Sequence, residues 1–202
     1  WTNAAVWRDG VVPAAGAAAA FTGAGGTVTV PTGYPFALSA LLFNTNGATA
    51  AWTVAGETNA LVGPAEVRVA ANAVTFACAL SGSAGLAKTG DGTAELAASN
   101  NVFSGKVSVL GGLLRARCDG SLGAVPEAAV PDALTLDGGG LGNTLEPLTV
   151  GPLRGITVGP NGGWFLARYW MPTVIEAPVT GPGPVLITRQ SDAVTFSNPA
   201  ND

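Results

Sequence analysis

The chain has 202 residues, with 13 acidic and 9 basic side chains, a net charge of −4 and no histidine. Without histidine, the Ser-His-Asp and Cys-His catalytic couples and histidine metal ligands are excluded, so any catalysis would depend on carboxylates. The acidic balance and the lack of clustered Lys and Arg argue against nucleic acid as a partner. No cofactor motif is found, and we expect no cofactor.

The N-terminal region carries no charge from residue 10 to residue 56. Its longest apolar stretch, Ala17 to Phe21, is far shorter than the roughly 20 residues of a membrane-spanning helix, so we expect no membrane span. Ala14 to Ala20 is the one helical candidate, and residues 1–26 are a candidate cap or docking segment. The chain starts at Trp1 without a recognisable signal peptide, so we expect either a processed exported protein or a fragment.

Short β-type segments follow one another along the whole chain, separated by Gly, Pro, Asn and Asp. They are expected at Thr27–Val30, Ala37–Phe43, Trp52–Ala55, Glu66–Val69, Val74–Leu80, Thr93–Leu96, Lys106–Leu110, Leu113–Arg117, Leu134–Leu136, Leu148–Val150, Ile156–Val158, Trp164–Ala167, Val185–Thr188 and Ala193–Phe196. This pattern predicts an all-β protein that forms a single module over residues 1–202.

Either an antiparallel sandwich or a parallel β-solenoid can contain many short strands. Strict alternation of inward-facing and outward-facing residues in very short strands favours the solenoid. A faint internal repeat also favours it. In that repeat, the segment 80–100 recurs in degenerate form at 179–198.

Residues 82–114 carry a more specific pattern. They contain Gly-Leu-x-Lys-x-Gly-x-Gly from Gly85, Ser-x-Asn-x-Phe-x-Gly from Ser99, and Val-x-x-Gly-x-Leu from Val109. The segment resembles the autotransporter-associated β-strand repeat. The resemblance implies a right-handed parallel β-helix of a secreted or surface-displayed bacterial protein, with no catalytic residue in the motif.

Within this segment, the alternation predicts which side chains face the interior of the solenoid. They are Leu86, Leu96, Val107, Val109 and Leu113, with glycines at the corners.

The two cysteines, Cys78 and Cys118, lie forty positions apart. In an exported protein an even number of cysteines is typical of a disulfide. The alternative is a pair of buried free thiols in separate turns, and the sequence leaves both open.

The carboxylates do not form a recognisable catalytic set. Asp91, Asp119, Asp132 and Asp137 all stand in evident turns, where Asp is common for conformational reasons. We therefore expect no enzyme activity and no metal site. The alternative is a β-helix that binds or cleaves polysaccharide.

An aromatic cluster at residues 164–172 is the strongest candidate for a binding surface. Trp164, Phe165, Tyr169 and Trp170 surround Arg168, and Trp, Tyr and Arg are the residues that most often dominate interfaces. We expect an insertion on the flank of the solenoid that contacts a glycan or a protein.

The two ends of the chain suggest contacts between subunits. The last strand-like segment, with Phe196 and Asn198, matches only the middle of the repeat, and Trp1 and Trp7 stand at the other end. An open end turn pairs readily with another chain, and head-to-tail contacts build filaments. The sequence therefore predicts a non-catalytic structural protein, exported to the cell surface, whose partners are further copies of itself and, in the alternative, surface glycans.

Overall fold

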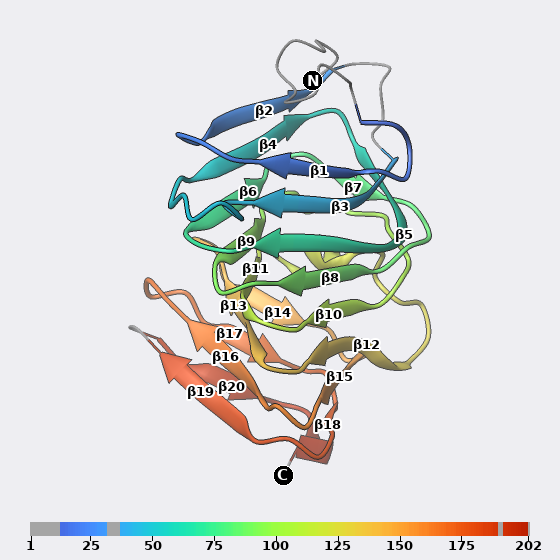
Figure 1. The fold of residues 1–202 in the computed structure, drawn as a ribbon. Helices are drawn as coiled ribbons and strands as arrows, with labels where there is room; N and C mark the ends of the chain where they lie inside the picture. The colour runs from blue at the N-terminus through green and yellow to red at the C-terminus, as the bar shows by residue number, and fades with distance from the viewer. Residues whose placement is uncertain (1–12, 32–36, 190–191, 202) are drawn as a thin grey trace.

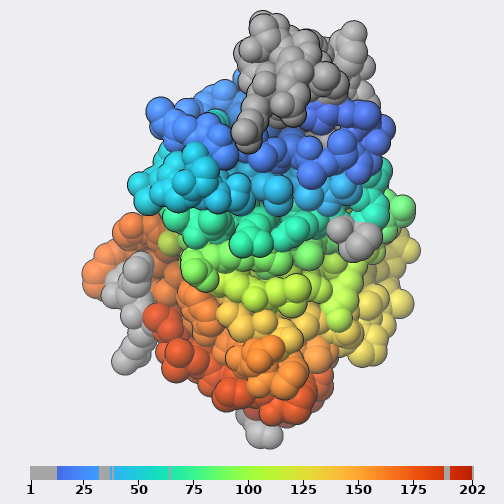
Figure 2. Space-filling view, viewed as in Figure 1, coloured from blue at the N-terminus to red at the C-terminus, as the bar shows by residue number. Residues whose placement is uncertain are grey.

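The computed structural model describes residues 13–31, 37–189 and 192–201. Trp1 and Trp7, two of the expected subunit contacts, lie outside these ranges. The described chain forms eight stacked turns, which run from the N-terminal to the C-terminal end of the molecule (Figure 1). In the space-filling view the successive turns follow one another as layers of changing colour (Figure 2).

Each turn contributes one strand to each of two long sheets. The first sheet contains, in spatial order, β1 (Ala18–Phe21), β3 (Ala37–Phe43), β5 (Asn59–Val69), β8 (Leu86–Thr89), β10 (Val107–Val109), β12 (Val130–Leu136), β15 (Arg154–Val158) and β18 (Val179–Thr180), with β7 (Leu80–Ser81) also paired to β5. The second contains β2 (Gly26–Val30), β4 (Trp52–Gly56), β6 (Ala73–Phe76), β9 (Thr93–Leu96), β11 (Gly112–Ala116), β13 (Gly139–Asn143), β16 (Gly163–Ala167) and β19 (Val185–Arg189).

The last three turns add a third sheet, which consists of β14 (Leu148–Val150), β17 (Thr173–Ile175) and β20 (Val194–Phe196). Two short 3₁₀ helices, η2 (Asp119–Leu122) and η3 (Pro199–Asn201), are the only described helices. Neither is long or apolar enough to cross a membrane.

All pairing within the three sheets is parallel, and this decides between the two architectures that the sequence left open. An antiparallel sandwich is excluded, and the all-β parallel β-solenoid is confirmed. The strand alternation explains the result, because each turn is apolar toward the inside and can bury that face only against its neighbours.

The core is a set of side-chain columns that run along the stack. In one column Leu86 pairs in register with Val107, Val107 with Leu134, and Leu134 with Ile156. All four side chains are buried. Aliphatic side chains of similar size stack on one another and fill a narrow interior. This agrees with a chain that is poor in large aromatic residues.

Close approach between turns explains the glycines at two corners. Gly112 has φ +59°, and a Cβ built there would lie 2.3 Å from the carbonyl oxygen of Gly92. At Gly105 a Cβ would lie 2.2 Å from the backbone nitrogen of Gly85 in the preceding turn. Any larger residue at these positions would push adjacent turns apart.

Polar side chains inside the solenoid form hydrogen bonds with backbone N–H and carbonyl groups where strands end. The fully buried Lys88 donates from Nζ to the carbonyl oxygens of Thr89 at 2.9 Å, Gly90 at 2.7 Å and Gly111 at 3.0 Å. Asn101 accepts the Leu80 N–H at 2.8 Å and donates to the Ser121 carbonyl at 2.6 Å. These buried side chains link one turn to the next.

Three expectations about local structure are wrong. The expected helix at Ala14 to Ala20 does not form, because Ala18–Phe21 is strand β1, which pairs with β3. Four residues form more stable hydrogen bonds with a partner strand than within a single helical turn. Leu114, and not Leu113, is the interior residue of β11, since it is Leu114 that pairs with the buried Ala94. The repeat at 179–198 is not a structural copy throughout, because β20 lies in the third sheet whereas β9 lies in the second.

Candidate functional site

A tight turn after β16 projects two aromatic side chains from the solenoid. Arg168 and Met171 form an antiparallel bridge, and the Met171 N–H donates to the Arg168 carbonyl at 3.1 Å. Tyr169 and Trp170 between them both have left-handed backbone conformations, with φ of 56° and 62°. Two left-handed central residues define a two-residue hairpin turn, which holds both side chains outward. Tyr169 is 51% exposed and Trp170 is 79% exposed.

Buried polar groups anchor the base of this turn. The Asn143 side chain accepts the Arg168 N–H at 3.0 Å and donates to the Arg168 carbonyl at 3.2 Å. The Arg168 guanidinium carbon lies 3.8 Å from the centroid of the Tyr169 ring, a cation–π contact. Asn143 is fully buried, so the turn is tied to the preceding solenoid turn and keeps a fixed orientation.

The five residues of the predicted aromatic cluster do not form one surface. Phe165 is fully buried and packs edge-to-face on Phe196 with a centroid separation of 5.3 Å. Trp164 lies on the outside of the second sheet, over Gly140, where a Cβ would lie 2.2 Å from its ring. Both belong to β16, so Tyr169 and Trp170 are the members of the cluster that project from the solenoid. We call residues 168–171 the aromatic turn.

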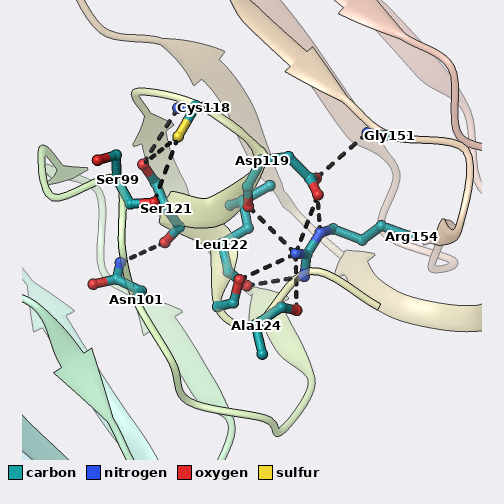
Figure 3. A network of polar contacts seen from close by, with 10 residues as sticks. Ser99, Asn101, Cys118, Asp119, Ser121, Leu122, Ala124, Gly151 and Arg154 are labelled. Carbon is teal, nitrogen blue, oxygen red and sulfur yellow. Dashed lines mark hydrogen bonds and ion pairs between the residues drawn. The ribbon is translucent and has the colours of Figure 1, made fainter. Parts of the chain in front are cut away.

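An ion pair between β15 and η2 was missed by the sequence analysis, which assigned Asp119 to a turn. Arg154 is 4% exposed and donates from Nε to Asp119 Oδ1 at 2.8 Å (Figure 3). Its other nitrogens donate to the carbonyl oxygens of Leu122 at 3.0 Å, Gly123 at 3.2 Å and Ala124 at 3.1 Å. The pair therefore fastens η2 and the loop after it to β15, and its role is structural. The sequence did not indicate this contact, because the two residues are 35 positions apart in the chain.

The cysteines are free thiols, which corrects the disulfide alternative. Cys78 is buried and its Sγ accepts from Asn59 Nδ2 at 2.9 Å, whereas Cys118 is half-buried and contacts the Ser99 carbonyl at 3.8 Å (Figure 3). Burial raises the pKa of the Cys78 thiol, which keeps it protonated at neutral pH.

The register of the sheets explains why no bridge forms. Phe76 pairs with Leu96, and Leu96 pairs with Ala116, so the residues two positions further on, Cys78 and Cys118, are two turns apart. Two strand spacings amount to about 9.5 Å. A disulfide requires Cα atoms within about 7 Å.

The acidic residues that the sequence placed in turns make local contacts. Asp132 pairs with Lys106 and accepts from the Thr135 hydroxyl at 2.8 Å, and Asp137 Oδ1 accepts the Asn161 N–H at 2.8 Å. In the described part of the chain, no three His, Cys, Asp or Glu side chains gather as a metal site would require.

The last turn leaves interior positions uncovered. Val185 and Ile187 pair in register with the buried Gly163 and Phe165, yet they are 44% and 49% exposed. Phe196 is half-buried, and Asn198 Nδ2 donates to the Glu176 carbonyl at 2.8 Å. The equivalent positions of earlier turns are covered by the turn that follows, and in the described chain no further turn stacks on β19.

The comparisons with known proteins point to one kind of protein. The chain is 33% identical over 185 residues to the Adhesin BmaC autotransporter of Brucella suis biovar 1 (strain 1330), a match that covers 91% of this chain and 5% of that protein. No family model and no solved structure matches the chain. The chain is therefore similar, over nearly its whole length, to one short segment of an autotransporter adhesin, and its β-solenoid is the fold expected of an autotransporter passenger.

Proposed function

We propose that the chain is a non-catalytic segment of an exported surface adhesin and that the aromatic turn supplies an adhesive contact. The similarity to an autotransporter adhesin over 91% of the chain carries this proposal. The solenoid supports it physically, because a stack of turns holds a short projecting loop at a fixed height and orientation.

The aromatic turn has the properties of a contact surface. Tyr169 and Trp170 are large and exposed, and their backbone is fixed by the bridge between Arg168 and Met171. Rigid aromatic side chains lose little conformational entropy on binding and commonly contribute most of the binding energy of an interface. A partner would therefore find a preformed surface.

Substitution of Trp170 by Ser is expected to reduce adhesion. Beads coated with the 202-residue chain should attach to cultured epithelial cells, and the Trp170→Ser variant should attach about tenfold less, as expected when an interface loses a central aromatic residue. Val125→Ser is the matched control, since Val125 is 58% exposed but lies outside the aromatic turn. Equal attachment of the Trp170 variant, the Val125 variant and the unmodified chain would refute the proposed contact.

A second proposal concerns the uncovered last turn, which has the geometry of a docking site for the first turn of another copy. Val185 and Ile187 offer apolar side chains, and β19 is the last strand of its sheet. Burial of such a surface in a head-to-tail contact would produce fibres, because a contact of this kind does not close on itself.

Introduction of a charge at the end turn tests this second proposal. We expect sedimentation to show larger assemblies as the concentration of the unmodified chain rises, and Ile187→Glu to remain monomeric because its carboxylate would be buried in the contact. Leu110→Glu is the control, with a side chain of similar exposure (48%) on the flank. A chain that stays monomeric at millimolar concentration would rule out self-assembly while leaving the adhesive role intact.

A further inference from the structure

Two arginines lie on the outer face of the second sheet near the aromatic turn. Arg115 of β11 pairs in register with Gly142, and Gly142 pairs with Leu166, two residues before Arg168. Gly142 has no side chain, and the Leu166 side chain packs over it. Arg168 follows the end of β16, at the base of the aromatic turn. Arg168 itself is 9% exposed.

Neither guanidinium is fully satisfied within the described residues. The Nε atoms of Arg115 and Arg168 are buried and have no hydrogen-bond partner there. A buried donor without an acceptor is unfavourable, and native structures contain few of them. The Nε atoms themselves are enclosed, but the Arg115 side chain is 20% exposed, so a ligand can reach this guanidinium from solvent.

The charges at this place are unbalanced. Glu95 is the carboxylate nearest Arg115, at 3.9 Å, while Arg117 is already paired with Glu146 at 3.8 Å. Within the described residues, Arg115 has this one carboxylate at 3.9 Å, and no ion pair is found for Arg168. Burial and then the charge of Arg168 lower the pKa of Arg115, whereas Glu95 and Tyr169 act in the opposite direction. A further anion would relieve the repulsion between the two arginines.

We propose that Arg115, Arg168 and the aromatic turn form a binding site for an acidic sugar, in which the arginines bind the carboxylate of a uronic acid and Tyr169 and Trp170 contact the sugar ring. This inference rests on the proposed adhesive function and names its ligand class. A planar carboxylate fits the fork of a guanidinium, and sugar rings pack on exposed aromatic faces. Charge and shape therefore both favour a uronic acid over a neutral sugar.

The probe for this site is a hyaluronan hexasaccharide, which carries uronic carboxylates, with its methyl ester as the neutral counterpart. Calorimetric titration of the full 202-residue chain should show binding of the hexasaccharide and none of the ester. Arg168→Gln should weaken binding at least tenfold, as expected when a charge-assisted hydrogen bond is lost. Arg168→Lys, which keeps the charge but not the planar fork, should bind with intermediate affinity.

Arg68→Gln is the control, since it makes the same change of charge at an exposed arginine of the first sheet and should bind within twofold of the unmodified chain. Circular dichroism establishes that each variant is folded. Equal binding of the hexasaccharide and its ester, or equal binding by Arg168→Gln and Arg68→Gln, would overturn the site. Binding of dextran sulfate oligosaccharides without the hexasaccharide would overturn the carboxylate assignment.

The bead assay separates this inference from the function on which it depends. Loss of attachment in Trp170→Ser but not in Arg168→Gln would leave the adhesive turn standing and refute the acidic sugar. Unchanged attachment in Trp170→Ser would refute the proposed function itself.

Discussion

Substitution of Arg154 by Met is expected to lower the free energy of unfolding by about 3–5 kcal/mol, the usual cost of removing one partner of a buried ion pair. The change leaves the Asp119 carboxylate without its guanidinium and removes the donor to the Leu122, Gly123 and Ala124 carbonyls. Guanidinium chloride denaturation followed by circular dichroism measures the effect.

Two further variants identify the cause of this loss. Arg68→Met removes an exposed arginine and should change stability by no more than about 0.5 kcal/mol. In the double variant Arg154→Met with Asp119→Ala, the cost should be clearly smaller than the sum of the single costs, because no lone carboxylate remains. An Arg154→Met variant as stable as Arg68→Met would contradict the role given to this pair.

Substitution of Lys88 by Met should destabilise the chain by about 2 kcal/mol at pH 7. The carbonyl oxygens of Thr89, Gly90 and Gly111 lose the Nζ donor, and this loss outweighs the relief from burying a charge. Lys106→Met is the control, because Lys106 pairs with Asp132 at the surface, where such pairs contribute about 0–1 kcal/mol.

The same lysine predicts how stability changes with pH. Burial lowers the pKa of Lys88 to about 8 from its usual value of 10.5, and the charge of Asp91 partly offsets this effect. Between these two values the unfolded chain binds more protons than the folded chain, so the contribution of Lys88 to stability rises with pH. The rise amounts to roughly 3 kcal/mol in total.

Denaturation midpoints of the unmodified chain and of Lys88→Met, measured from pH 7 to pH 10.5, isolate this contribution. The difference in stability between the two chains should grow as pH rises through 8. A difference that stays constant over the range would show that Lys88 does not titrate in the folded state with a lowered pKa.

Local sequence pattern was sufficient to predict the class of fold. Alternating residues in short segments, with glycine at the corners, specify strands that are apolar on one side, and the motif from Gly85 to Leu114 indicates that they stack. The clustering of aromatic residues between Trp164 and Trp170 was also visible in the sequence, but not which of them are exposed. These features depend on neighbours in the chain, which a sequence displays directly.

Features that depend on the register between turns were not predictable in this way. The number of residues per turn varies: Leu86 pairs with Val107, 21 positions later, whereas Leu41 pairs with Val67, 26 positions later. The contact between Arg154 and Asp119, the separation of Cys78 from Cys118, and the choice of Leu114 over Leu113 all follow from that register. Trp164 and Phe165 divide between the outside and the core because successive side chains of a strand point to opposite faces.

Parallel stacking in this register is the central claim, and counting free thiols after denaturation without reductant tests it directly. The unmodified chain should show two thiols, because Cys78 and Cys118 are two turns apart. Ala98 occupies the turn between them, about 4.8 Å from either position.

The Ala98→Cys variant, under mild oxidation, should therefore show one thiol and one bridge between adjacent turns. A bridge between Cys78 and Cys118 in the unmodified chain, or three free thiols in the oxidised variant, would contradict the stacked register.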